Sequence, residues 1–154
     1  MKVYSLRASQ LIPLTREQAW AFFSSPSNLE AITPGFLNFS ITSTVPAEIH
    51  SGLIITYRIA AVAGIPMTWV TEISHVEPGV RFVDEQRIGP FRFWYHEHGF
   101  RSVDGGIEMT DQVHYVMPWG WLGRAIHAVF IRDRLSRIFE FRRHYIANRF
   151  GTLA

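Results

Sequence analysis

The chain has 154 residues, of which 47% are hydrophobic and 18% are charged, and its formal net charge at pH 7 is +2. This length and composition predict one globular domain over residues 1–154 and exclude a largely disordered chain. The absence of cysteine excludes disulfides, thiolate nucleophiles, iron–sulfur clusters and cysteine-ligated zinc. No stretch has the roughly 18 apolar residues of a membrane span, and the N-terminus lacks a secretory apolar core, so we expect a cytoplasmic protein.

The first elements predict a strand followed by two short helices. Residues 3–12 alternate loosely between apolar and polar side chains, which is typical of a strand. Thr15 and Gln18 have the spacing of a capping box and predict a helix over residues 16–23. A second short helix is predicted over residues 28–32, before a Thr-Pro-Gly stop.

The next part of the chain follows the two-residue period of β-strands, and Gly and Pro mark its turns. Six strands are predicted, over residues 36–42, 53–59, 66–73, 81–88, 91–103 and 107–116. Strands at this spacing form an antiparallel meander. The apolar hairpin tip at residues 60–65 is a candidate shield for the entrance of a cavity.

After Pro118 the apolar residues recur at helical spacing and predict one helix of about 28 residues that ends near Phe150. Its apolar stripe needs cover, so we expect it to lie against the sheet. The predicted fold class is therefore α+β. A seven-stranded curved antiparallel sheet wraps around a long C-terminal helix, with two short helices between strands 1 and 2.

Positive charge is concentrated in this last segment. Residues 119–154 hold seven arginines against Asp133 and Glu140, which is a net charge of +5. Such a helix can contact an anionic membrane surface, or it can simply present a solvated face. Trp119 and Trp121 stand just before it and form either a hydrophobic lip at a pocket mouth or an anchor for the helix start.

Strand alternation gathers histidines and carboxylates on one face of the sheet. If Asp104-Gly105 is a two-residue hairpin turn, His98 lies opposite Asp111, and the preceding Gly-Pro turn places Asp84 opposite His96. The same registers pair aromatic Trp94 with Tyr115 and apolar Phe100 with Met109, and they place His96 opposite Val113 and Gln86 opposite Trp94. This face carries more large apolar residues than the alternate face, so we expect it to point inward.

Two interpretations of the His–Asp pairs remain open. They can be satisfied polar links that hold the register, or they can line a pocket and orient a polar ligand group. Because histidine titrates near neutrality, His96, His98 and Asp111 are the candidate catalytic residues if the protein is an enzyme. Two histidines two residues apart with an aspartate can also ligate a metal, but we expect none. The predicted ligand-binding residues are Trp69, Phe82, Asp84, Gln86, Trp94, His96, His98, Phe100, Asp111, Val113, Tyr115, Ile126 and Phe130.

The run Phe82-x-Asp84-x-Gln86-x-x-Gly89-Pro90-Phe91-x-x-Trp94-x-His96-x-His98-x-Phe100, followed by Asp111-x-Val113-x-Tyr115-x-x-Pro118, resembles a branch of the START-like SRPBCC superfamily. That superfamily includes polyketide cyclase/dehydrase-like and Bet v 1-like proteins. The resemblance covers nearly the whole chain and implies a helix-grip fold with a deep cavity between sheet and C-terminal helix. Its members bind lipids, sterols, polyketides or plant hormones, and some are aromatase/cyclases.

We therefore predict a protein that binds a hydrophobic or amphipathic small molecule of the lipid, polyketide or aromatic class. One alternative is a polyketide cyclase/dehydratase-like enzyme that uses His96 or His98 as acid/base. A second alternative is a lipid- or membrane-associated adaptor that uses the arginine-rich helix. The sequence has no P-loop, dinucleotide fingerprint or nucleophile elbow, so we expect no cofactor and no nucleic-acid partner. The ligand and the oligomeric state stay open.

Overall fold

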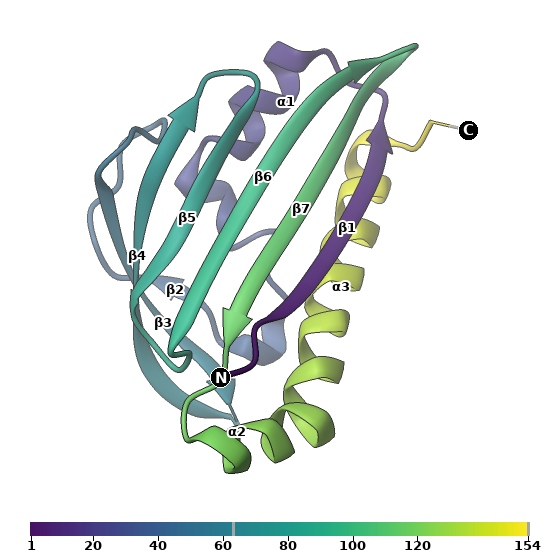
Figure 1. The fold of residues 1–154 in the computed structure, drawn as a ribbon. Coiled ribbons are helices and arrows are strands. Elements are labelled where there is room, and N and C mark those ends of the chain that lie inside the picture. The colour runs from purple at the N-terminus through teal and green to yellow at the C-terminus, as the bar shows by residue number, and fades with distance from the viewer. Residues whose placement is uncertain (63, 154) are drawn as a thin grey trace.

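Seven strands form one antiparallel sheet in the order β1-β7-β6-β5-β4-β3-β2, and helices lie on its concave face (Figure 1). The computed structural model describes residues 1–62 and 64–153. The strands are β1 (Tyr4–Ile12), β2 (Ser40–Ile41), β3 (Leu53–Val62), β4 (Ile65–Glu77), β5 (Arg81–Ile88), β6 (Phe93–Val103) and β7 (Gly106–Val116). The predicted helix-grip fold is confirmed. The side chains at residues 61–63, in the expected shield, lie outside the described residues.

The helices are α1 (Arg16–Phe23), the 3₁₀ helices η1 (Pro26–Leu29) and η2 (Gly35–Leu37), α2 (Gly120–Ile126), the π-helical turn η3 (His127–Ile131) and α3 (Arg132–Phe150). The first short helix has its predicted bounds, whereas η1 begins two residues before the predicted range 28–32. The strand predicted over residues 36–42 is wrong over most of its length, since β2 covers only its end. Gly35–Leu37 form η2 instead, and Asn38 then adopts a left-handed backbone with φ of 44°, which interrupts a strand.

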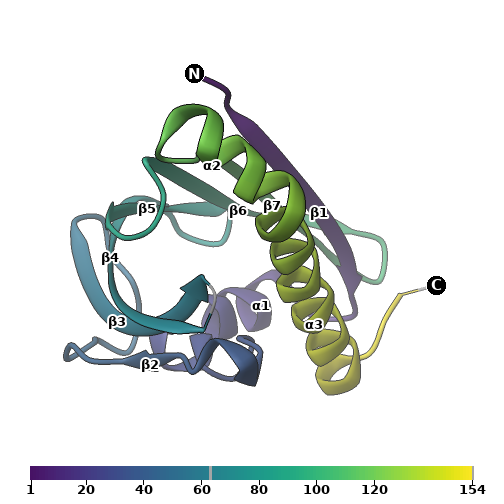
Figure 2. The same ribbon diagram turned by 90° about the horizontal axis from the view of Figure 1, so that it is seen from below.

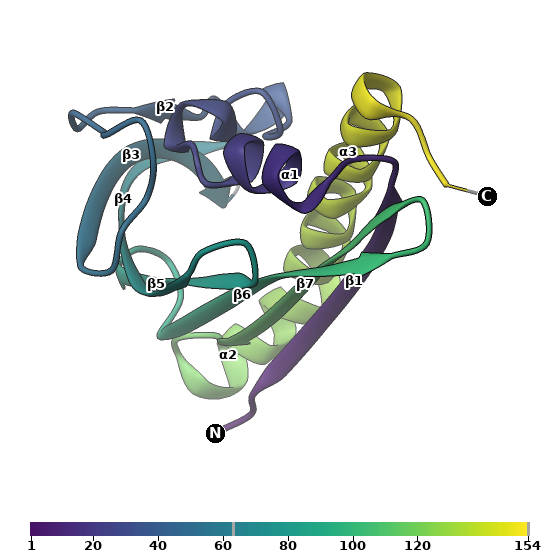
Figure 3. The same cartoon turned by 90° about the horizontal axis from the view of Figure 1, so that it is seen from above.

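Helix α1 begins at the predicted capping box. The N–H of Gln18 donates to Thr15 Oγ1 at 3.2 Å, and the N–H of Thr15 donates to Gln18 Oε1 at 2.9 Å. These bonds satisfy backbone groups that the first helical turn would otherwise leave unpaired. The Trp20 ring then packs edge-on against Phe100, with 5.8 Å between ring centroids. Helix α1 therefore covers one end of the concave face of the sheet (Figure 3).

The registers predicted for the His–Asp face are confirmed with one exception. The confirmed pairs are His98–Asp111, His96–Val113, Trp94–Tyr115 and Phe100–Met109 between β6 and β7, and Asp84–His96 between β5 and β6. Side chains on this face are buried, with exposed fractions of 7% for His96, 5% for His98 and 7% for Asp111. The hairpin turns and the hydrophobic alternation are local features, so they determine the register without help from distant residues.

The exception is the predicted pairing of Gln86 with Trp94, because the β5–β6 ladder ends at Glu85 and Tyr95. Gln86 instead folds over the hairpin loop, where its side chain accepts from the Phe91 N–H at 3.2 Å and donates to the Phe91 carbonyl at 2.7 Å. A Cβ at Gly89 would lie 2.4 Å from the Gln86 amide oxygen. The glycine is therefore what leaves room for this loop.

The C-terminal helix runs without a break from Gly120 to Phe150, as predicted, and crosses the concave face beside β1 (Figure 2). Ile131, Leu135 and Ile146 are buried on its inner side. Near its start, Tyr115 Oη and His127 Nε2 share a hydrogen bond of 2.8 Å that ties the π-helical turn to β7. Among the described residues, no helix combines the length and the hydropathy of a membrane span.

Candidate functional site

A cavity of about 200 Å³ lies between the concave face of the sheet, the segment from α1 to β2, and α3. Its wall is mostly aromatic and aliphatic, and includes Ile55, Phe82 and Trp94 from the strands and Leu135, Ile138 and Phe139 from α3. The volume is below the roughly 300–1,000 Å³ of pockets for drug-sized ligands, which favours a small occupant. Two groups of polar side chains interrupt the apolar wall.

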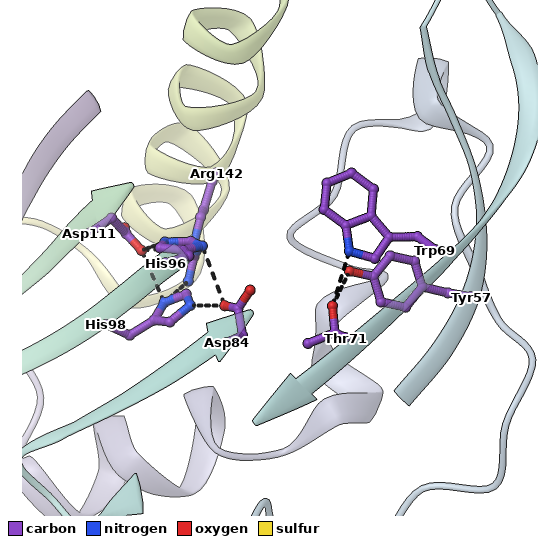
Figure 4. A network of polar contacts seen from close by, with 8 residues as sticks. All are labelled: Tyr57, Trp69, Thr71, Asp84, His96, His98, Asp111 and Arg142. Atoms are coloured by element: carbon purple, nitrogen blue, oxygen red, sulfur yellow. Dashed lines mark hydrogen bonds and ion pairs between the residues drawn. The ribbon is translucent and has the colours of Figure 1, made fainter. Parts of the chain in front are cut away.

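The first group, here called the charged wall, joins His96, His98, Asp84, Asp111 and Arg142 (Figure 4). Although the strands pair His98 with Asp111 and Asp84 with His96, each histidine contacts both carboxylates. His96 Nε2 lies 2.9 Å from Asp111 Oδ1, and His98 Nε2 lies 2.8 Å from Asp84 Oδ2. His98 Nδ1 lies 3.0 Å from Asp111 Oδ1, and His96 Nδ1 lies 3.4 Å from Asp84 Oδ2. The two predicted pairs are therefore one cluster.

The two histidines have opposite protonation preferences. Burial and the positive charge of His98 lower the pKa of His96, so this ring is neutral, and we assign its proton to Nε2 because that nitrogen makes the shorter contact. Burial also works against the charged form of His98, but its hydrogen bonds to Asp111 and Asp84 outweigh burial and raise its pKa. His98 Nδ1 has two neighbours: Asp111 Oδ1 at 3.0 Å, which can accept a proton, and Arg142 Nη2 at 3.4 Å, which can only donate one. Because the acceptor is closer, we assign a proton to Nδ1 as well as to Nε2.

Arg142 completes the charge balance from the opposite side of the cavity. It reaches down from α3 and places Nη1 3.2 Å from Asp111 Oδ1. Burial alone would raise the pKa of Asp111, but Arg142 and the two histidines hold it well below 3.8. The pKa of Asp84 is likewise lowered by the histidines against the effect of burial. With both ring nitrogens of His98 protonated, two carboxylates face one arginine and one imidazolium, and this balance of charge lowers the cost of burying the cluster.

The donor atoms of Asp84, His96 and His98 all lie within 4.8 Å of one another, which is close enough for a metal ion. Their chemistry suits such an ion less well. The protons on His98 and the guanidinium of Arg142 already compensate the charge of both carboxylates. A metal ion would have to displace a proton from His98 before it could bind there. The residues therefore fit a proton-compensated cluster better than a metal centre.

The second group, here called the neutral wall, faces the charged wall across the cavity (Figure 4). Trp69 Nε1 donates to Thr71 Oγ1 at 3.1 Å, and the Tyr57 and Thr71 hydroxyls share a hydrogen bond of 2.8 Å. All three side chains are buried. Burial, and then the negative charge of Asp84, raise the pKa of Tyr57, so its phenol keeps its proton.

Arg134 bridges the two sides of the cavity at another point of the wall. Its Nη2 donates to the Ala60 carbonyl of β3 at 2.7 Å, and its guanidinium lies over the Phe36 ring at 4.8 Å. Burial and the neighbouring Arg137 lower the pKa of Arg134. The sequence offered no signal for this bridge, because it joins residues 74 positions apart.

Six of the thirteen predicted ligand-binding residues lie on the cavity wall: Trp69, Phe82, Asp84, Trp94, His96 and His98. Their contact with a ligand stays a prediction. The structure places the other seven elsewhere: Gln86, Phe100, Asp111, Val113, Tyr115, Ile126 and Phe130.

Packing explains these displacements. Phe100 is covered by α1, and Tyr115 stacks on Tyr4, with 5.5 Å between the ring centroids. Asp111 is behind the histidines, where it borders a groove between β1 and α3. Alternation places a residue on the inner face, but only the position of the helices decides whether it borders the cavity.

The sequence reasoning missed Tyr57 and Thr71 on β3 and β4, and Arg134 and Arg142 on α3. The alternation of Ile55, Tyr57 and Ile59 could have identified the inward face of β3. No local pattern could have singled out Arg142 among the seven arginines of the C-terminal segment, because its burial depends on where the helix crosses the sheet.

The family model described as "Polyketide cyclase / dehydrase and lipid transport" matches residues 12–142. The chain therefore belongs to this family. No curated protein matches it significantly.

Solved structures share the fold at low sequence identity. Protein CV1439 from Chromobacterium violaceum is 10% identical with a TM-score of 0.71, over 97% of this chain and 99% of that one. A Rhodobacter sphaeroides protein is 21% identical with a TM-score of 0.63, over 94% and 93%. The di-domain ARO/CYC StfQ of the steffimycin biosynthetic pathway is 10% identical with a TM-score of 0.63, over 96% of this chain and 52% of that one. At these identities the comparison shows the fold alone.

Proposed function

We propose that this protein binds a small, largely apolar molecule that carries a hydrogen-bond acceptor, in the cavity between the sheet and α3. The molecule belongs to the lipid, polyketide or aromatic class. Family membership and an apolar cavity of about 200 Å³ support the binding role. The acceptor follows from the hydrogen bonds of the neutral wall.

The neutral wall has one more proton than it uses. Its donors are the Trp69 indole N–H and the hydroxyls of Tyr57 and Thr71. The indole proton goes to Thr71 Oγ1, and one hydroxyl proton lies between the two oxygens. Whichever hydroxyl donates that bond, the other keeps a proton without an acceptor among the described residues. Because both hydroxyls line the cavity, a carbonyl, ether or hydroxyl oxygen of the ligand can accept it.

The charged wall supports binding more than catalysis. A general acid or base needs a nitrogen within hydrogen-bond reach of the substrate. Every ring nitrogen of His96 and His98 already lies within 3.4 Å of a carboxylate. The cyclase/dehydratase alternative would need this cluster to open, whereas a binding protein can keep it closed.

A pair of ligands with matched shape tests the proposal. Acetophenone carries a carbonyl oxygen, and isopropylbenzene has nearly the same shape without an acceptor. Titration calorimetry should show that the wild-type chain prefers acetophenone. Thr71→Val removes the acceptor that Trp69 and Tyr57 share and so leaves both donors free for the ligand; it should tighten acetophenone binding by up to about tenfold, the equivalent of one further hydrogen bond, and leave isopropylbenzene binding unchanged. An equal change for both ligands, or no binding of either, would contradict the proposal.

A further inference from the structure

The outer side of the helical segment between β7 and α3 is apolar and exposed. The residues that form it, here called the α2 face, are Trp119, Trp121, Leu122, Ala125, Ala128 and Val129. The exposed fractions are 70% for Trp119, 73% for Trp121, 46% for Leu122 and 85% for Val129. Exposed large apolar side chains are common singly, but a contiguous group that includes two tryptophans marks an interaction surface.

The backbone before α2 holds these tryptophans outward. Trp119 has a φ of 59°, a left-handed conformation that costs free energy in a residue with a side chain, and Gly120 follows with a φ of 53°. A Cβ at Gly123 would lie 1.8 Å from the Pro118 carbonyl oxygen, so only glycine permits the first turn of α2 to pack this closely. The tryptophans are thus presented by a specific turn and not by a loose end.

Most of the charges around the α2 face are positive. Residues 119–133 contain Arg124 and Arg132, both exposed, against one acidic residue, Asp133, which is exposed as well. Lys2 adds a third positive charge, since it lies near His127 and over the Tyr4 ring that stacks on His127. Figures 1 and 2 place α2 and the N-terminus at the same end of the molecule.

We propose that the α2 face is a docking surface for a membrane that contains anionic lipids. Tryptophan side chains favour the boundary between lipid headgroups and acyl chains, and flanking arginines attract anionic headgroups. A second copy of this chain fits less well, because a twofold contact through this face would bring together two surfaces that both carry a net positive charge. The charge pattern therefore selects an anionic partner.

The docking surface is distinct from the arginine-rich face of α3. Arg142 is buried in the charged wall, and Arg134 and Arg137 lie over the Phe36 ring. The inner side of the segment that docks includes Ile131, which borders the cavity. Docking would therefore bring the cavity wall next to the lipid surface, although the docking proposal does not depend on what the cavity binds.

Flotation of the full chain with vesicles tests the proposal. Vesicles of phosphatidylcholine alone are compared with vesicles of equal parts phosphatidylcholine and phosphatidylglycerol, at low and high salt. We expect binding to the anionic vesicles that weakens as salt rises. Trp119→Asn with Trp121→Gln should reduce the partition coefficient by at least about tenfold, because two indoles leave the interface. Asparagine tolerates the left-handed backbone at position 119, so this variant should fold.

A charge reversal inside the α2 face is a second test, and two variants outside this face, Arg143→Glu and Val80→Gln, are controls. Arg124→Glu and Arg143→Glu change the net charge equally, and both positions are exposed, but position 143 lies outside the segment that carries the α2 face. Only the first should weaken anionic-vesicle binding, by about fivefold or more. Val80→Gln removes an apolar residue that is 37% exposed in the turn between β4 and β5, outside the α2 face, and should have no effect. The proposal is overturned if the wild-type chain does not float, or if the tryptophan variants change only a monomer–dimer equilibrium in sedimentation.

Discussion

The two polar walls of the cavity differ in how completely they satisfy themselves. In the charged wall, two carboxylates, two histidines and Arg142 meet one another at distances of 2.8 to 3.4 Å, so the charges are paired and only Arg142 Nε is buried without a hydrogen-bond partner among the described residues. In the neutral wall, Tyr57, Thr71 and Trp69 make two hydrogen bonds and keep one spare proton. The charged wall is built to hold sheet and helix together, and the neutral wall is built to accept a partner.

This difference has an energetic reason. An unpaired buried charge costs several kcal/mol, so a charged cluster that opened for each ligand would destabilise the fold. An unpaired hydroxyl costs roughly 1–3 kcal/mol, and a ligand oxygen can recover that amount on binding. Four measurements would separate the two roles, with effects that decrease from Arg142 to Tyr57.

Arg142→Met should have the largest effect on stability. The substitution keeps the length of the apolar stem but leaves the buried Asp84, Asp111 and His98 with a net negative charge. Removing one partner of a buried ion pair typically costs about 3–5 kcal/mol, which urea unfolding would measure. Arg143→Met is the matched control, because its side chain is exposed on the same helix, and it should change the unfolding free energy by less than about 0.5 kcal/mol. Similar losses for both variants would mean that the charged wall does not join helix to sheet.

Thr71→Val should cost about 2 kcal/mol in the ligand-free protein. Valine has nearly the shape of threonine, but it leaves the Trp69 N–H and the Tyr57 hydroxyl without their shared acceptor. Unfolding in urea gives the stability, and the indole proton chemical shift of Trp69 reports the lost bond. A variant as stable as wild type would show that the neutral wall is already satisfied by other means.

The pKa values of the two histidines in the charged wall should be shifted in opposite directions. NMR titration should place the pKa of His98 above 6.5 and that of His96 below it. A raised pKa in the folded state adds stability that is fully present below pH 6.5 and is lost as pH rises through the folded pKa, by at most about 1.4 kcal/mol per pH unit. His98→Gln should remove this alkaline loss. Asp84 and Asp111, with lowered pKa values, add stability above their unfolded pKa that is lost as pH falls.

Tyr57→Phe should have the smallest effect of the four, about 1 kcal/mol. It removes one neutral hydrogen bond, while Thr71 still accepts from Trp69. Urea unfolding of Tyr57→Phe, Thr71→Val and the double variant forms a double-mutant cycle. Because the two hydroxyls are in contact, their effects should not add. Strict additivity would mean that the two hydroxyls do not interact.

The sequence was most informative about features that depend on neighbours in the chain. The capping box of Thr15 and Gln18, the Asp104-Gly105 turn and the pairing of His98 with Asp111 all follow from short-range spacing. The same alternation identified the buried face that carries both histidines. It failed at Asn38, where a left-handed residue interrupted a predicted strand, and at Gln86, where side-chain bonds to Phe91 replaced the ladder.

The sequence by itself thus determined the sheet, its register and the inward position of the His–Asp residues, because turns and two-residue alternation act locally. Only the tertiary structure decided which of these residues border a cavity, and that Arg142 neutralises Asp111 while Tyr57 meets Thr71 across two strands. Those outcomes depend on where α3 crosses the curved sheet and how far the sheet bends. Many distant contacts set both quantities together, and no short segment of the chain encodes either one.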